Sequence, residues 1–334
     1  MSLKKWFVNG RYGALVQSVM PAVLAVVLAI GHEGFNVWLS LLAVIGVEFA
    51  HLALNLSDDY FDYKADMLAD RINVVRKGFK AYTAKYPYLT DGTATVGDLK
   101  KAIALFSLVA IVCGIVILIF RGWPVVVIAA VTAFLGVFYS APPLKLGFHG
   151  MGELIIGIVF GPLLMMGVYF AACGAIEPSV VWLSVPVGLL VVNILFTHSY
   201  IDNVGDGESE KLTLSGLLRT DRANLSMSFI LNFLPSLLVV LAVILGRVPW
   251  PYLFTLLVLP RNIWLFWSLV KFSRKEEIPL EKPAWYLGNM GKWELYRKMG
   301  LDWYLIRWLT ARNALSLFCL ILIVVTLVLL IFGH

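Results

Sequence analysis

The stretch from Glu48 to Asp66 reads EFAHLALNLSDDYFDYKAD and passes from an apolar run into a row of carboxylates. On a helix, the spacing i, i+4, i+7 and i+11 places four of its side chains on one face: Asn55, Asp59, Asp62 and Asp66. Like charges at such spacings repel by roughly 0.2–0.5 kcal/mol per pair when exposed, so their stacking indicates a bound cation. Oxygen ligands suit Mg²⁺, which is often shared with substrate phosphates. The alternative is a solvated acidic end that only terminates a membrane helix.

The composition excludes a soluble enzyme. The 334 residues are 60% hydrophobic and only 14% charged, with a mean hydropathy of +0.84. Apolar runs of about 18–20 residues, long enough to cross a hydrocarbon core of roughly 30 Å, recur along the chain. We read the first run as a retained helix and not as a cleaved signal peptide. The sequence therefore predicts one all-α domain, a polytopic bundle of nine transmembrane helices around a central cavity. The expected spans are 14–30, 37–56, 102–120, 123–140, 152–172, 180–200, 226–245, 250–271 and 311–332.

The basic residues sort the loops between these spans into two classes. Loops on the side of the N-terminus hold 24 Lys and Arg, whereas the opposite loops hold only Arg121 and Arg247. By the positive-inside rule, the N-terminus and the Asp-rich stretch are expected on the cytoplasmic side, in a bacterial or archaeal cytoplasmic membrane. The net charge of +6 is spread over the loops, so it indicates no nucleic-acid partner. No obligatory protein partner is evident, and the three cysteines indicate neither a disulfide nor a metal site.

A second acidic cluster follows the sixth expected span. Asp202 and Asp206 are four residues apart and emerge on the same membrane side as the first cluster. Two clusters of this kind can hold divalent ions that bridge a diphosphate. A diphosphate also calls for positive charge, for which Arg71 and Lys145 are the candidates. The alternative for each basic residue is a topological anchor. A membrane cavity with such a mouth suits a substrate with a diphosphate head and a long hydrocarbon tail, a polyprenyl diphosphate.

Two further features leave alternatives open. Glu48 and His51 lie on the same helical stripe as Asn55 but deeper in the span, so they either orient a second substrate or only hydrogen-bond between helices. The segment 272–310 mixes tryptophans with Lys and Arg. It suits a helix lying among lipid headgroups, or a plain linker with interfacial aromatic residues.

The motifs in combination resemble a known family. Residues 55–66 resemble the first Asp-rich motif of the UbiA superfamily of intramembrane aromatic prenyltransferases, roughly N-x-x-N-D-x-x-D-x-x-x-D, and Asp202-x-x-x-Asp206 resembles its second. Arg71 stands where that family often has an arginine. The run from Tyr139 to Glu153, YSAPPLKLGFHGMGE, is similar to a stretch found in the menaquinone branch of the family. The resemblance covers roughly residues 10–270 and 311–332.

This resemblance implies a reaction and a role for each residue. Mg²⁺ held by Asn55 and the carboxylates of both clusters would neutralise the diphosphate, and Arg71 and Lys145 would stabilise the departing charge. Tyr139 would stabilise an allylic cation, and Glu48 or an Asp of the first motif would take a proton or orient the phenol. The expected activity is prenyl transfer to a hydroxyaromatic acid, with 1,4-dihydroxy-2-naphthoate favoured by the 139–153 stretch.

Several positions depart from the family pattern. Asp58 replaces an amide, His198 and Ser199 stand where the menaquinone branch often has two asparagines, and its usual G-K-x-T-L motif is represented by residues 210–214, EKLTL. The acceptor alternatives are 4-hydroxybenzoate, homogentisate and a lipid precursor. An ion-coupled transporter is the rival from another class, but it predicts acids near the middle of spans, whereas these cluster at span ends.

Overall fold

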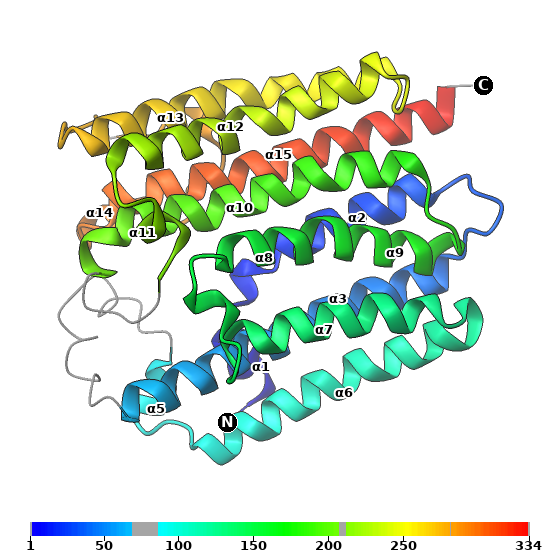
Figure 1. Ribbon diagram of the computed structural model, residues 1–334, viewed down its shortest axis with the longest axis horizontal. Coiled ribbons are helices and arrows are strands. Elements are labelled where there is room, and N and C mark those ends of the chain that lie inside the picture. Colours follow the sequence, from blue (N-terminus) through cyan, green and yellow to red (C-terminus); the bar gives the residue numbers. More distant parts are fainter. Residues whose placement is uncertain (1, 69–85, 207–211, 281, 333–334) are drawn as a thin grey trace.

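The apolar runs of the sequence form long, roughly aligned helices in the computed structural model of the chain, which describes residues 2–68, 86–206, 212–280 and 282–332 (Figure 1). The elements are α1 (Leu3–Asn9), η1 (Tyr12–Ala14), α2 (Val16–Ala29), α3 (Val37–Leu68), α5 (Pro87–Thr90), α6 (Val96–Arg121), α7 (Pro124–Ser140), η3 (Leu146–Phe148), α8 (Gly152–Ile158), η4 (Val159–Leu163), α9 (Leu164–Cys173), α10 (Pro178–Asp206), α11 (Leu214–Leu218), α12 (Asp221–Ile244), η5 (Trp250–Val258), α13 (Leu259–Ser273), η6 (Trp285–Leu287), α14 (Trp293–Lys298) and α15 (Asp302–Phe332). The all-α prediction is confirmed.

Seven helical segments within the described residues are long and apolar enough to cross a membrane. Two shorter apolar helices, α2 and α7, coincide with two further expected spans. The fifth expected span is interrupted by η4, a π-helical turn that contains Pro162, because proline has no N–H with which to continue the α-helical ladder. The last span begins earlier than expected, since α15 starts at Asp302, two residues after a left-handed glycine at position 300.

Helix α10, which carries the second acidic cluster, lies at the centre of the bundle. Of its most apolar 18-residue window, 72% is buried, against 17% for α6. A Cβ on Gly161 would lie 2.5 Å from Cα of Gly188, and one on Gly188 would lie 2.6 Å from O of Gly157. Only glycine permits backbones to approach this closely, and small residues are the usual means of packing helices within a membrane. These contacts fix α8, η4 and α10 as one unit.

A separate apolar cluster supports the end of α3, which carries the first acidic cluster. Leu52 and Leu56 of α3 pack with Trp6 of α1, Tyr88 of α5 and Phe106 of α6. The ring centroids of Trp6 and Tyr88 are 5.6 Å apart in an edge-to-face arrangement, which is a favoured geometry for aromatic pairs. The N-terminal helix and the segment after the first motif are therefore packed against the same part of α3.

The tryptophan-rich segment is neither one continuous helix nor a plain linker. Its described residues form η6 and α14, which contribute to a third apolar cluster with α13 and α15. Arg261 of α13 donates to O of Tyr286 at 2.5 Å, and Asn313 of α15 donates to O of Leu287 and Asn289 at 3.0 and 2.9 Å. The segment is thus attached through its own backbone carbonyls to the last two long helices.

Candidate active site

Asp59 of the first motif is held by two residues from outside its own helix. Its side chain has an exposed fraction of 0%. Arg11, between α1 and η1, donates to Oδ1, and the hydroxyl of Tyr88 in α5 donates to Oδ2 at 2.8 Å. Burial, followed by the charge of Asp59, raises the pKa of Tyr88, so the phenol stays a neutral donor. Both Asp59 oxygens therefore accept from protein groups in this structure, and the role of Asp59 as a metal ligand stays a prediction.

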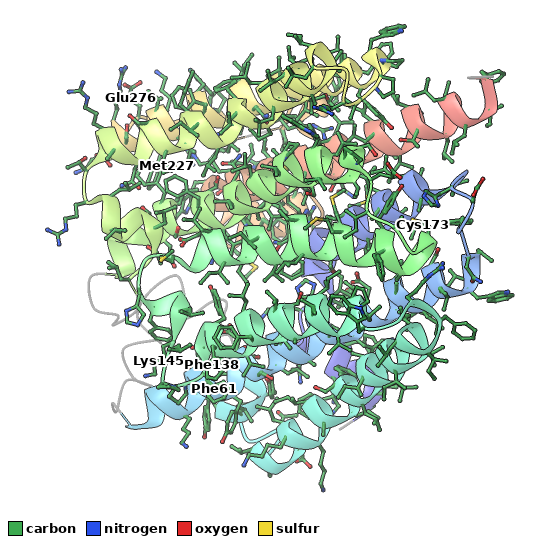
Figure 2. All side chains as sticks on the ribbon, turned by 45° about the vertical axis from the view of Figure 1, so that its right-hand side comes forward. Phe61, Phe138, Lys145, Cys173, Met227 and Glu276 are labelled. Carbon is green, nitrogen blue, oxygen red and sulfur yellow. The ribbon has the colours of Figure 1, made fainter. Side chains whose placement is uncertain are left out.

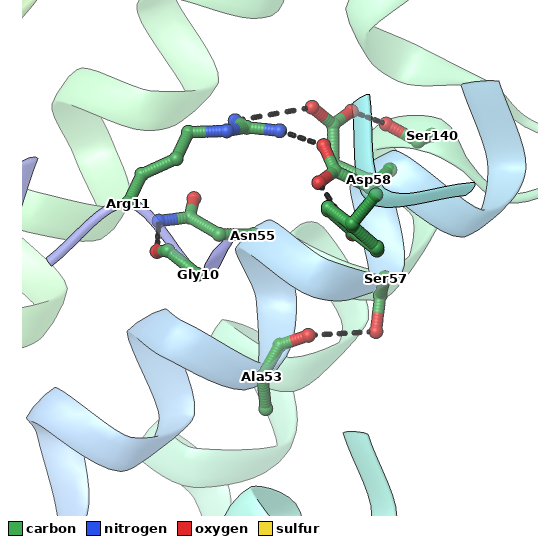
Figure 3. Close-up of polar contacts among 9 residues, drawn as sticks. Gly10, Arg11, Ala53, Asn55, Ser57, Asp58 and Ser140 are labelled. Carbon is green, nitrogen blue, oxygen red and sulfur yellow. Dashed lines mark hydrogen bonds and ion pairs between the residues drawn. The ribbon is translucent and has the colours of Figure 1, made fainter. Parts of the chain in front are cut away.

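Asp58, the preceding residue, shares Arg11 with Asp59 and also contacts Ser140 (Figure 3). Ser140, the last residue of α7, donates to its Oδ1 at 2.5 Å, and Nη1 of Arg11 lies 3.6 Å from its Oδ2. Because residues four apart share a helix face, Asp58 lies on the same face as Asp62. The sequence interpretation placed Asn55, Asp59 and Asp62 on one face and treated Asp58 only as a departure from an amide.

The backbone between α1 and η1 is shaped to present Arg11. Arg11 has φ 60°, in the left-handed region that few non-glycine residues adopt. The side-chain amide of Asn55 donates to O of the preceding Gly10 at 2.9 Å, as Figure 3 shows. Asn55 therefore anchors the N-terminal segment in this structure. The sequence interpretation gave Arg11 only a topological role, and nothing in its spacing relates it to α3.

Lys145 lies in the loop between α7 and α8. Its backbone is left-handed, with φ 43°, and its ammonium lies 5.5 Å from the ring centroid of Phe148. A Cβ on Gly147 would lie 2.8 Å from Cζ of Tyr139, and one on Gly152 would lie 3.1 Å from the Tyr139 hydroxyl. Gly147 and Gly152 thus lie against Tyr139, and a larger residue at either position would displace the Tyr139 side chain.

Just before the second motif, α10 forms hydrogen bonds to two other helices. His198 Nδ1 lies 2.6 Å from the hydroxyl of Tyr304 in α15. Ser199 donates to Oε1 of Glu153 in α8 at 2.8 Å. Asp202, one turn further along, is partly buried. The rotation of α10 about its axis is therefore fixed from both sides just before Asp202.

A single loop contacts the first motif at one end and α10, just before the second motif, at the other. Ser140 at one end of the loop is bonded to Asp58, and Glu153 at the other end is bonded to Ser199. The loop between them carries Lys145, which lies toward one end of the bundle whereas Cys173 lies toward the other (Figure 2). The structure therefore brings the first motif, Lys145 and the helix of Asp202 to the same end of the molecule.

Glu48 and His51 lie deeper in the bundle. The hydroxyl of Ser18 in α2 donates to Oε2 of Glu48 at 2.9 Å. The same hydroxyl oxygen lies 2.8 Å from Nδ1 of His51. Oε1 of Glu48 is buried and has no hydrogen-bond partner among the residues that the structure describes. Glu48 precedes Asp59 by 11 residues, which is about 16 Å along a helix. This group links α2 to α3 and lies well below the carboxylates at the motif end.

Three expected site residues lie outside the described side chains: Asp66, Arg71 and Asp206. Within the part of the chain that the structure describes, no three His, Cys, Asp or Glu side chains are grouped to hold a metal. The described donors at the motif end, Asp58, Asp62 and Asp202, offer carboxylate oxygens, which is the donor chemistry that Mg²⁺ prefers. The donor set therefore fits Mg²⁺ in kind.

The sequence that forms this arrangement also matches a known protein family. A model of the UbiA prenyltransferase family matches residues 18–286. The chain belongs to the UbiA prenyltransferase family. It is therefore a membrane-embedded prenyltransferase.

Two relatives of the chain are named for naphthoquinone or naphthoate substrates. The chain is 28% identical over 286 residues to a 2-carboxy-1,4-naphthoquinone phytyltransferase of Synechocystis, covering 82% of this chain and 85% of the relative. It is 25% identical over 213 residues to a 1,4-dihydroxy-2-naphthoate octaprenyltransferase of Bacillus subtilis, covering 62% of this chain and 64% of the relative.

Solved structures share the fold at lower sequence identity. A UbiA homologue from Archaeoglobus fulgidus, solved with GPP and Mg²⁺, superposes with a TM-score of 0.61 at 14% identity, covering 93% of this chain and 99% of that one. A digeranylgeranylglyceryl phosphate synthase superposes with a TM-score of 0.60 at 19% identity, covering 97% and 98%. The bundle is thus the UbiA fold.

Proposed function

We propose that this UbiA family member uses Mg²⁺ to transfer an isoprenyl group from a polyprenyl diphosphate to a hydroxyaromatic acid, 1,4-dihydroxy-2-naphthoate. One observation supports the location of the reaction: one end of the loop that carries Lys145 is bonded to Asp58 of the first motif, and the other end is bonded to Ser199, three residues before Asp202. A diphosphate bound there would meet carboxylate-held Mg²⁺ and a lysine together.

The residues have distinct roles in this proposal. Asp58, Asp62 and Asp66 of the first motif and Asp202 and Asp206 of the second would hold the ions. Mg²⁺, when bound, offsets the charge of the diphosphate and makes it a better leaving group. Asp59, already bonded to Arg11 and Tyr88, would hold α3 in position, as would Asn55 through Gly10.

The remaining polar groups would act on the departing and attacking atoms. Lys145 and Arg71 would stabilise the charge that accumulates as the C–O bond breaks, and Tyr139 would face the allylic carbon. A ring carbon of the acceptor would then form the new bond and release its proton. Glu48, about 16 Å below Asp59, is too deep to take that proton, so an Asp of the first motif is the better candidate.

The choice of acceptor is supported by the relatives. Proteins from Synechocystis and Bacillus subtilis, both named for naphthoate-type substrates, match 82% and 62% of this chain. This agrees with the menaquinone-branch resemblance of residues 139–153.

The membrane arrangement completes the proposal. The seven long segments, together with α2 and α7, would make nine spans of one domain, and both motifs would face the cytoplasm because the motif side carries 24 of the Lys and Arg residues. Polyprenyl diphosphate could then enter from the surrounding lipid.

The proposal is tested by transfer of a labelled polyprenyl diphosphate by the purified protein, with and without Mg²⁺, to a panel of aromatic acids. We expect Mg²⁺-dependent product with the naphthoate. Asp62→Asn and Asp202→Asn should each reduce transfer at least a hundredfold, a loss of about 2.7 kcal/mol or more in transition-state stabilisation. Asp91→Asn is the matched control, because Asp91 is exposed and bonded only within its own turn, to Thr93.

The outcomes separate the parts of the proposal. Product with a different acid would replace the acceptor and retain the reaction. Wild-type turnover in both the Asp62 and Asp202 variants would refute the two-motif site. Metal-independent transfer would refute the role of Mg²⁺.

A further inference from the structure

Glu153 is a buried carboxylate that touches no expected substrate position. It lies in the first turn of α8 with an exposed fraction of 5%. Its Oε1 accepts from the hydroxyl of Ser199 at 2.8 Å. The backbone N–H of Leu214, the first residue of α11, donates to both of its oxygens, at 3.2 and 3.1 Å. A buried carboxylate is tolerated only when donors compensate its lost hydration, and here these donors come from two other elements.

The donors lie beside the segments that would bind diphosphate. Ser199 precedes Asp202 by less than one helical turn. Leu214 follows Leu212, whose O accepts from N of Gly150 at 2.8 Å and whose N donates to O of Phe148 at 3.2 Å. Gly150 and Phe148 belong to the same loop as Lys145. Glu153 and this short backbone pairing therefore join the Lys145 loop, the end of α10 and the start of α11.

We propose that Glu153 is a positioning residue for the prenyl diphosphate, which sets the Lys145 loop against Asp202. The proposal rests on the proposed function, because it assumes that Lys145 and Asp202 act on the same diphosphate. Glu153 itself stays buried and contacts no substrate. Without the Glu153 carboxylate, the Lys145 loop and the end of α10 lose their shared partner. Lys145 and Asp202 are then no longer held at a fixed separation.

The substitution Glu153→Gln tests this with nearly unchanged volume. One of the two acceptor oxygens becomes an NH₂ group, which cannot accept from Leu214 N–H. We expect the KM for polyprenyl diphosphate to rise about tenfold, as for loss of one hydrogen bond to a charged group. The KM for the acceptor should change less than about twofold, because the acceptor does not depend on the separation of Lys145 and Asp202.

Two further variants separate positioning from simple packing. Ser199→Ala removes only the contact from α10, so it should give a smaller rise in the same KM. Tyr304→Phe removes the hydroxyl beside His198, on the same turn of α10 but away from the Lys145 loop, and should leave that KM within about twofold. If all three variants lower thermal stability alike and none changes the KM for polyprenyl diphosphate, Glu153 only packs helices and the proposal is wrong.

Hydrogen–deuterium exchange of the substrate-free protein supplies a readout independent of activity. Glu153→Gln should speed exchange of the backbone amides in 146–153 and 212–218 and leave those in 221–244 unchanged. Unchanged exchange in both loops would overturn the proposal. A wild-type protein that transfers nothing would refute the proposed function, and the exchange result would still decide whether Glu153 joins the two loops. If Glu153→Gln does not fold, Ser199→Ala decides between the two explanations.

Discussion

At the scale of single residues, neighbouring carboxylates on α3 have different environments. Asp59 is fully buried between Arg11 and Tyr88, whereas Asp58 lies beside Ser140 at the loop that carries Lys145. A buried charge is stable only while its partners remain, and removing one partner costs more than the pair itself contributes. Arg11 is thus essential to the first motif although it is 48 residues away in sequence.

Arg11→Ala should therefore destabilise the protein by about 3–5 kcal/mol, because it leaves the Asp59 charge buried without its cation. Tyr88→Phe removes one hydrogen bond to the same carboxylate and should cost less, about 1.5–3 kcal/mol. Thermal unfolding in detergent measures both losses of stability.

Lys4→Ala is the control, because Lys4 is an exposed basic residue of the same segment. Adding Asp59→Asn to Arg11→Ala should restore part of the loss. Equal stability of the Arg11 and Lys4 variants would contradict this account.

At the scale of helices, the position of the second motif depends on close packing of backbones. The contacts of Gly157 and Gly161 with Gly188 bring α8 and η4 against α10. Because the neighbouring atoms are backbone, an added methyl group cannot be accommodated by a rotamer change. The position of α10 in the turns before Asp202 therefore requires glycine, which has no side chain, at positions 157, 161 and 188.

Gly188→Ala should lower thermal stability by about 1–3 kcal/mol, the usual cost of overpacking, and reduce prenyl transfer with it. Gly114→Ala in α6 is the matched control, since no atom lies within 4 Å of a Cβ at that position. Replacing glycine within a helix by alanine without a clash is neutral or favourable, by up to about 1 kcal/mol. A Gly188 variant as stable as the Gly114 variant would show that the helices can separate at no cost.

At the scale of the whole molecule, the long helices end with their charged loops on one side. The motifs, the Lys145 loop and α11 lie at one end of the bundle, and the loop between α2 and α3 lies at the other (Figure 1). By the positive-inside rule, the strong imbalance of Lys and Arg is the reason why we propose that the motif end faces the cytoplasm.

Single added cysteines test this orientation. Thr93→Cys at the motif end and Glu33→Cys at the opposite end both replace exposed residues, and the three native cysteines are buried. In intact cells, a membrane-impermeant maleimide should label the Glu33→Cys variant and not the Thr93→Cys variant, and inside-out vesicles should give the reverse. Labelling of the Thr93→Cys variant from outside intact cells would invert the proposed topology.

The class of fold and the location of both motifs could be predicted from the sequence. A membrane helix satisfies its backbone hydrogen bonds within itself, so length and apolarity suffice to find it. The acidic clusters stand out because like charges stacked on one helix face repel each other, and two such clusters emerge on the same membrane side. The tryptophan-rich segment was less predictable: the backbone of η6 is held by Arg261 and Asn313, which lie in other helices.

The folded structure was needed to show which protein groups contact each carboxylate of the first motif. Adjacent residues on a helix differ by about 100° in direction, so spacing alone permits a face through Asp58 or one through Asp59. Arg11 and Tyr88, 48 and 29 residues from Asp59 in sequence, reach that carboxylate through the packing of α1 and α5. Glu153 likewise gained a role only when folding placed Ser199 and Leu214 beside it. Contacts between distant segments carry no local sequence pattern, and for that reason the fold could be predicted from the chain but the assignment of its carboxylates could not.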